Sequence, residues 1–148
     1  MKISTKGRYG LRAMVDIALN SNGDYIPLKQ IAERQNISEN YLEQVFSTLR
    51  KAGLVKSVRG SQGGYCLSKK PSAITVGDVL RILEGELNIS NDDKENSNLQ
   101  KTIEDCIRVT VWDEVTKAIN NVVDSITLED LVNQYKKFNT EYILDFII

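Results

Sequence analysis

Residues 55–67 read Val-Lys-Ser-Val-Arg-Gly-Ser-Gln-Gly-Gly-Tyr-Cys-Leu, two short apolar stretches on either side of a glycine-rich tip. The β-branched and aromatic residues predict two strands, and the glycines allow the positive φ that a tight tip needs. This is the pattern of a wing. Arg59 stands beside the tip, where a thin loop could carry it into a narrow minor groove of DNA. Hairpins of this composition are more often simple turns, so the neighbouring elements decide the interpretation.

Three helices are expected before the hairpin. Apolar residues recur at helical spacing from about residue 6 to residue 19, and Pro27 opens a short second helix that ends near Asn36. Ser38 caps the third helix, in which apolar positions at i, i+3, i+4 and i+7 predict a buried face. That face consists of Leu42, Val45, Phe46 and Leu49. Two helices joined by a short turn and followed by a wing form a winged helix-turn-helix.

The outer face of the third helix carries side chains that can hydrogen-bond to base edges. Amide side chains pair with adenine, a carboxylate accepts from cytosine, and a hydroxyl contacts either kind of base. With the wing arginine, the predicted base-reading residues are Asn40, Glu43, Gln44, Ser47 and Arg59. The residues predicted to contact the DNA backbone are Lys6, Arg8, Ser38, Tyr41, Arg50, Lys51 and Gly60. Any surface helix shows an outward polar stripe, so the order of the elements carries more of this inference than any one residue.

Two of these backbone contacts, Lys6 and Arg8, stand at the start of the first helix. The first backbone N–H groups of a helix are able to hold a phosphate, and the two basic side chains would assist. A charged N-terminus on a helix that only serves the core fits the same residues equally well.

The charge of the chain is divided unevenly along its length. Residues 1–70 hold 12 of the 19 Lys and Arg residues and 5 of the 20 Asp and Glu residues, a net charge of +7, so the remaining residues carry −8. This asymmetry predicts that the first half faces a polyanion such as double-stranded DNA.

The composition excludes several classes of function. The chain has no histidine, the commonest general base and metal ligand, and it shows no nucleophile–base pair or phosphate loop. We therefore expect no enzyme, no metal and no other cofactor. No apolar run approaches the roughly 20 residues of a membrane span, and the N-terminus lacks a signal-peptide core. These observations predict a cytoplasmic protein with no membrane partner.

The second half is expected to be helical. Residues 1–85 form the predicted DNA-binding domain, residues 86–98 a flexible loop, and residues 99–148 a dimerisation helix and C-terminal tail. From about residue 99 to residue 126 the apolar positions step by three and four along a seam. The predicted dimer interface is Trp112, Val115, Ile119, Val122 and Ile126. The seam covers only about two heptads, so packing against the core of its own chain is the alternative.

Several motifs together resemble the Rrf-two family of bacterial transcription regulators. They are residues 1–10, residues 38–44, residues 49–55, and Val58-Arg59-Gly60 with Gly63-Gly64-Tyr65. The resemblance implies a mainly α winged helix-turn-helix fold with a small β wing and a long dimerisation helix. It also implies a homodimer on a pseudo-palindromic operator, with Asn40, Glu43, Gln44 and Arg59 at base-reading positions.

The cysteines distinguish branches of this family. Cluster-sensing members carry three cysteines, whereas this chain has only Cys66 and Cys106, so an iron–sulfur cluster is not expected. Cys106 is interpreted as a small buried apolar residue, and an iron–sulfur or thiol-based redox sensor remains the alternative. The missing ligands make the chain similar to the cluster-free branch that represses cysteine metabolism.

That branch implies cysteine synthase as a candidate partner. The final residues, Asp145, Phe146, Ile147 and Ile148, are similar to the tail that serine acetyltransferases insert into this enzyme, and a backbone nest could capture the terminal carboxylate. The alternative is a tail that folds back onto its own domain. A winged helix that serves only as a protein-assembly module is a further alternative to the repressor.

Overall fold

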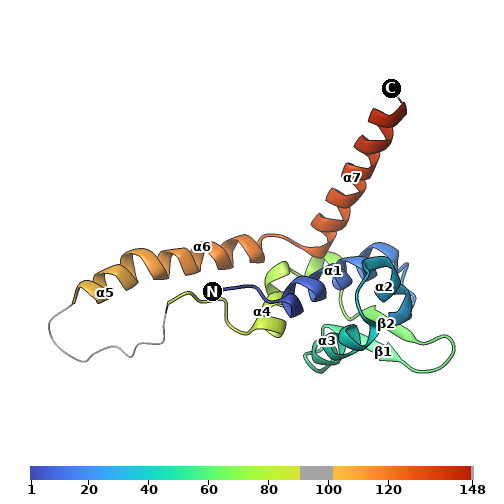
Figure 1. Cartoon of the computed structure of the whole chain (residues 1–148), viewed down its shortest axis with the longest axis horizontal. Helices are drawn as coiled ribbons and strands as arrows, with labels where there is room; N and C mark the ends of the chain where they lie inside the picture. Colours follow the sequence, from blue (N-terminus) through green and yellow to red (C-terminus); the bar gives the residue numbers. More distant parts are fainter. Residues whose placement is uncertain (91–101, 148) are drawn as a thin grey trace.

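The computed structural model describes residues 1–90 and 102–147 (Figure 1). Side-chain caps begin two helices of the N-terminal half: Ser4 Oγ accepts from the Gly7 amide (3.5 Å) and Ser38 Oγ from the Tyr41 amide (3.4 Å). Asn36, at φ 53°, ends the second helix and turns the chain into the third. The elements are helices α1 (Thr5–Asn20), α2 (Leu28–Gln35), α3 (Glu39–Lys51) and α4 (Val76–Glu84), strands β1 (Val55–Val58) and β2 (Gly64–Leu67), and a 3-10 turn, η1 (Pro71–Ala73).

The main hydrophobic core lies where α1 to α4 meet. The inner face of α3 points into it as the spacing predicts, with Leu42 and Phe46 fully buried. Burial of one such side chain contributes about 1.5–3 kcal/mol, so α3 has a strong preference for this rotation about its axis. Its polar side chains must therefore face solvent. The predicted fold, mainly α with a small β wing, is confirmed.

The wing is an antiparallel hairpin in which residues 55–58 pair with residues 64–67. A β-bridge joins it to the residue before α2: the amides of Ile26 and Tyr65 donate to each other's carbonyl oxygens at 2.9 and 2.8 Å. The Tyr65 ring also lies 4.8 Å from the ring of Phe46 on α3, measured between centroids. The base of the wing is thus fixed relative to α3.

The second half leaves this domain as two projecting arms (Figure 1). One is a continuous rod and the other is a single helix of 20 residues. Only the first turns of that helix reach the domain, through buried Leu128 and Val132. The elements are α5 (Ile103–Ile107), the π-helical segment η2 (Arg108–Trp112), α6 (Asp113–Asp124) and α7 (Leu128–Ile147).

Parts of the predicted second half lie outside the described residues. These are residues 91–98 of the expected loop, residues 99–101 of the expected long helix, and Ile148 of the tail. The described part of the long helix ends at Asp124, two residues earlier than the spacing predicts. Among the described helices, none combines the length and the apolar character that crossing a membrane would require.

One ion pair with a buried carboxylate joins α1 to the last turn of α2. The Asp16 side chain is 2% exposed; it accepts hydrogen bonds from Arg34 Nη2 at 2.7 Å, Arg34 Nε at 3.0 Å and Gln35 Nε2 at 2.9 Å. A buried carboxylate needs such partners, because desolvation of an unpaired charge costs several kcal/mol. The contact therefore holds the C-terminal end of α2 against α1.

Replacing Arg34 with alanine should lower the free energy of unfolding by roughly 3 kcal/mol, since Asp16 would stay buried with Gln35 as its one remaining side-chain donor. Urea unfolding followed by circular dichroism measures the change. Lys117→Ala is the matched control, because its pair with Glu114 is 70% and 62% exposed, and it should change the stability by less than about 0.5 kcal/mol. Equal effects of the two variants would contradict this account of Asp16.

Candidate nucleic-acid interface

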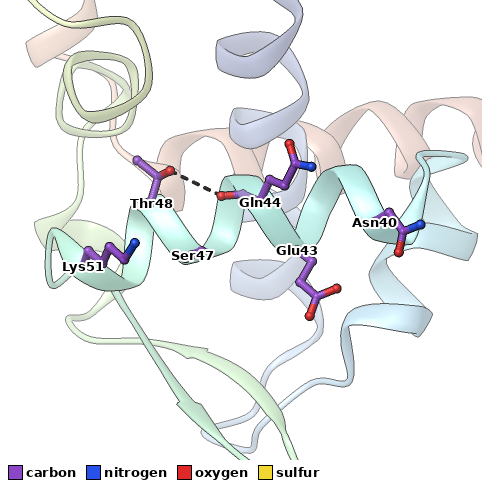
Figure 2. A pocket seen from close by; sticks show the side chains of 6 residues that line it. All are labelled: Asn40, Glu43, Gln44, Ser47, Thr48 and Lys51. Atoms are coloured by element: carbon purple, nitrogen blue, oxygen red, sulfur yellow. Dashed lines mark hydrogen bonds between the residues drawn. The ribbon is translucent and has the colours of Figure 1, made fainter.

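The outward face of α3 forms a shallow pocket lined by polar side chains (Figure 2). Gln44 and Thr48 extend from one edge of the helix and Glu43 extends from the opposite edge. Asn40, Glu43 and Gln44 are exposed, whereas Ser47 is half-buried. The structure brings the four base-reading candidates of the third helix together on one surface. Arg59 is not part of this pocket, since it stands on the wing.

Thr48 belongs to this surface and was missed in the sequence. Its hydroxyl donates to the Gln44 carbonyl oxygen at 3.3 Å, and its side chain lies between Gln44 and Lys51 in the pocket lining. The signal was present, because position 48 is four residues after Gln44 and so falls on the same helical face.

Arg59 stands at the exposed end of β1, beside the turn of the wing. Gly60 follows at φ 111°, and its carbonyl oxygen accepts from the Gly63 amide at 3.0 Å, which closes the tip. Arg50, at the end of α3, donates from Nη1 to Ser57 Oγ on β1 at 3.3 Å. This contact ties α3 directly to the wing.

The start of α1 differs from the expectation of an open phosphate site. Glu84, the last residue of α4, accepts hydrogen bonds at Oε1 from the Ser4 amide (3.0 Å), the Gly7 amide (2.9 Å) and the Ser4 hydroxyl. The carboxylate thus occupies the position that a phosphate would take, because both are anions that suit a helix N-terminus. Lys6 is half-buried, and Arg8 donates from Nε to the Ile3 carbonyl oxygen at 3.1 Å.

The two remaining backbone candidates lie at the start of α3. Ser38 is exposed and caps the helix, and half-buried Tyr41 packs edge-on against Tyr9 with 5.9 Å between ring centroids. The Arg12 guanidinium lies over the Tyr9 ring, 5.1 Å from its centroid. These contacts hold Tyr41 at the rim of the domain beside the α3 N-terminus.

The predicted dimer seam is divided between two environments. Ile119 and Ile126 pack against buried residues of their own chain, so the core-packing alternative holds for them. Trp112, Val115 and Val122 are 44%, 38% and 57% exposed. Other exposed apolar residues of the same arm extend this surface beyond the prediction, namely Ile103, Ile107, Val109 and Val111.

Both cysteines are free thiols, and the prediction that Cys106 is buried is wrong. It is exposed on α5 and not buried, because α5 projects away from the domain, and its Sγ lies 4.0 Å from Thr110 Oγ1. Cys66 is half-buried on β2, at the other end of the molecule (Figure 1). Two such separated thiols do not match the four ligands of an iron–sulfur cluster. Among the described residues, no three His, Cys, Asp or Glu side chains are close enough together to hold a metal ion.

The C-terminal residues end α7 and are not an extended tail. Phe146 and Ile147 are 81% and 74% exposed in its last turn, and Asp145 precedes them. Tyr135, Phe138 and Tyr142 are also more than half exposed. Within the described residues, the tail does not fold back onto the domain.

Comparisons with known proteins agree with this geometry. The family model described as "Rrf2: Iron-dependent Transcriptional regulator" matches residues 3–134. The chain is 45% identical over 135 residues to the HTH-type transcriptional regulator CymR of Bacillus subtilis, covering 90% of this chain and 91% of that protein. It is 43% identical over 134 residues to the HTH-type transcriptional regulator IscR of Yersinia enterocolitica, covering 90% and 80%.

The solved structure of CymR, described as the global cysteine regulator of B. subtilis, matches with a TM-score of 0.76 and 45% identity. The match covers 90% of this chain and 98% of that one. The family match ends at residue 134, so most of α7 lies beyond it.

Replacing Gly64 with alanine should detach the wing from the chain before α2. Gly64 has φ 154°, and a Cβ there would overlap the Ile26 carbonyl oxygen and break the bridge to Tyr65. Hydrogen exchange of the Ile26 and Tyr65 amides should become about tenfold faster or more, with the helical circular dichroism unchanged. Ser61→Ala at the exposed tip is the control, and unaltered exchange in the Gly64 variant would refute the clash.

Proposed function

Because the chain belongs to the Rrf2 family of transcriptional regulators, we propose that it represses transcription as a homodimer bound to a pseudo-palindromic operator. The observation that carries the proposal is the exposed polar face of α3 held beside the wing by Arg50 and by the contact between the Tyr65 and Phe46 rings. A rigid pairing of these two elements suits a reader that contacts a major groove and the adjoining minor groove at once.

In this proposal α3 reads bases in the major groove. Asn40 and Gln44 would pair with adenine, and Glu43 would accept from the N4 amino group of cytosine. A carboxylate this exposed repels phosphates, so Glu43 favours a position over a base edge and not over the backbone. Ser47 and Thr48 complete the face, and Lys51 and Arg50 would contact phosphates at its end.

The exposed arm made of α5, η2 and α6 supports the homodimer. Its apolar surface includes Val115, Val122 and Trp112, and it is larger than the two-heptad seam that the sequence predicts. Contiguous apolar surface of this kind marks an interaction site, and a symmetric partner presents the same surface in return. Pairing of two such arms would place two recognition helices on opposite half-sites.

The regulated genes are proposed to belong to cysteine metabolism, without an iron–sulfur cluster as the sensor. The support is the 45% identity to CymR, a global cysteine regulator, together with the lack of a fit between Cys66, Cys106 and a cluster. The exposed Cys106 thiol leaves redox control as the alternative signal.

Cysteine synthase is the proposed protein partner, and α7 is the proposed contact. The helix carries a row of exposed aromatic side chains that its own domain does not cover, and Phe146 stands near its free end. Aromatic residues of this exposure are typical anchors of protein interfaces. The last turn would have to unwind for the terminal carboxylate to enter a backbone nest.

Arg59→Ala should weaken operator binding by roughly 1–3 kcal/mol and relax the sequence preference at the minor-groove position. Lys51→Ala should weaken binding to all DNA alike and reduce the slope of log affinity against log salt by about one. Fluorescence anisotropy with operator and random duplexes at several salt concentrations separates the two roles. If both variants lose the same affinity on both duplexes, neither residue reads sequence. A wild type that ignores DNA at physiological salt would instead favour a protein-assembly module.

Deleting residues 146–148 should lower the affinity for purified cysteine synthase at least about tenfold, since the aromatic anchor Phe146 is lost. Isothermal titration calorimetry measures the change. Val58→Ala on the wing, where the side chain is 46% exposed, is the control for a general loss of apolar surface. Unchanged affinity after the deletion would remove the tail from the proposed contact.

A further inference from the structure

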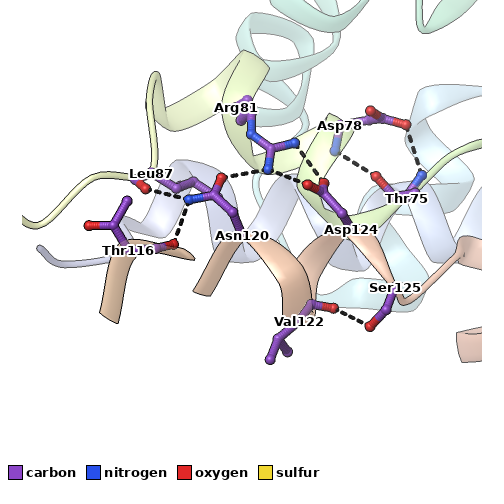
Figure 3. A network of polar contacts seen from close by, with 9 residues as sticks. All are labelled: Thr75, Asp78, Arg81, Leu87, Thr116, Asn120, Val122, Asp124 and Ser125. Carbon is purple, nitrogen blue, oxygen red and sulfur yellow. Dashed lines mark hydrogen bonds and ion pairs between the residues drawn. The ribbon is translucent and has the colours of Figure 1, made fainter. Parts of the chain in front are cut away.

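The DNA-binding domain is attached to the long arm by a polar network between α4 and α6 (Figure 3). Arg81 on α4 donates from Nη1 to Asp124 Oδ1 at 2.7 Å and from Nη2 to Asp124 Oδ2 at 2.8 Å. The same Nη2 donates to Asn120 Oδ1 at 2.6 Å. A bidentate pair with a third contact fixes the orientation of both helices, because the N–H groups of the planar guanidinium donate in fixed directions.

Asn120 extends this network to the chain that follows α4. Its Nδ2 donates to the Leu87 carbonyl oxygen at 2.9 Å and to the Thr116 carbonyl oxygen at 2.8 Å. Thr116 Oγ1 in turn accepts from the Ile89 amide at 3.3 Å. One face of α6 is therefore hydrogen-bonded both to α4 and to the segment leaving it, which restricts hinge motion at this point.

A small apolar cluster lies against the same network. Leu87, Leu80 and Val76 are buried, and Ile119 and Ile126 of the arm pack on them. Gly77 allows the close approach: a Cβ there would overlap Asp124 Oδ1 and lie 2.8 Å from Arg81 Nη1. A glycine inside a helix is unfavourable, so its presence fits a position where two helices must come this close.

The network is better suited to fixing geometry than to adding stability. The Arg81 and Asp124 side chains are 29% and 46% exposed, and pairs exposed to this degree contribute little to the free energy of folding. The hydrogen bonds from Arg81 hold the pKa of the Asp124 carboxyl below its usual range, so the pair stays charged at neutral pH. What the pair does is restrict the angle between α4 and α6.

The position of α4 is in turn coupled to that of α3 by side-chain packing. Leu83 on α4 lies against Gly10 of α1, where a Cβ would overlap Leu83 Cδ1 and lie 3.2 Å from Val45 Cγ1 on α3. Val45 belongs to the buried face that sets the rotation of α3. A rigid path of packed side chains thus runs from the arm through α4 to the base-reading surface.

We propose that Arg81, Asp124 and Asn120, the α4–α6 joint, are positioning residues that set the separation of the two recognition helices and so select the spacing between operator half-sites. This inference rests on the proposed dimeric repressor. Each added base pair moves a half-site by about 3.4 Å along the DNA and also rotates it, so a rigid joint tolerates few spacings. Loosening the joint should broaden the tolerated range without altering the base-reading surface.

The test uses a duplex selected by the wild-type protein from a random library, with the central spacer then shortened or lengthened by one and two base pairs. Wild type should bind the selected spacing about tenfold or more tightly than its neighbours. Asp124→Ala should reduce this preference to about threefold or less, with affinity for a single half-site and the melting temperature nearly unchanged. Glu114→Ala, which removes an exposed ion pair from the same helix, should keep the wild-type profile.

Asn120→Ala serves as the second variant in case Asp124→Ala unfolds, since it keeps the ion pair and should broaden the profile in the same direction. A folded variant with the wild-type spacing profile overturns the joint as a selector, while the proposed function stands. If the wild-type protein selects no duplex at all, the proposed function fails and the joint has no spacing to select.

Discussion

Two glycines of α1 allow α4 to lie directly against it. A Cβ at Gly7 would overlap the Glu84 carboxylate, and one at Gly10 would overlap Leu83. The close contact makes α4 the element that both halves of the molecule share. Its inner face completes the core behind the recognition helix, and its outer face holds the long arm. A change at this contact would therefore disturb the position of α3 and the position of the arm together.

The same contact explains the charges around the DNA-binding surface. Glu84 satisfies the first amides of α1, so that helix end is neutralised within the chain and has little attraction left for a phosphate. Asp16 is likewise neutralised by Arg34 in the interior. The basic side chains Arg50, Lys51 and Arg59 on α3 and the wing are exposed. They keep their positive charge available at the surface where α3 meets the wing.

Local signals predicted much of the fold. Apolar spacing predicted the buried face of α3, and the cap Ser38 predicted the start of that helix, because both signals depend on neighbours within one or two turns. Contacts between distant segments were not predictable in this way. Spacing identifies an apolar face but not what covers it, so Ile119 and Val122 were assigned to one seam although only Ile119 packs on its own chain. The prediction that Cys106 is buried was wrong for the same reason.

The π-helical segment η2 has a consequence for the arm as a whole. Ile103, Ile107, Val111 and Val115 are four residues apart, and each such step overshoots an α-helical turn by about 0.4 residue. Three steps in a regular α-helix would rotate the apolar side by about a third of a turn. The π-helical segment η2 has more residues per turn than an α-helix, so it reduces this rotation of the apolar side. The register of the exposed surface is therefore sensitive to length: loss of Thr110 would put the two ends of the arm out of phase, although every exposed apolar side chain of the arm would still be present.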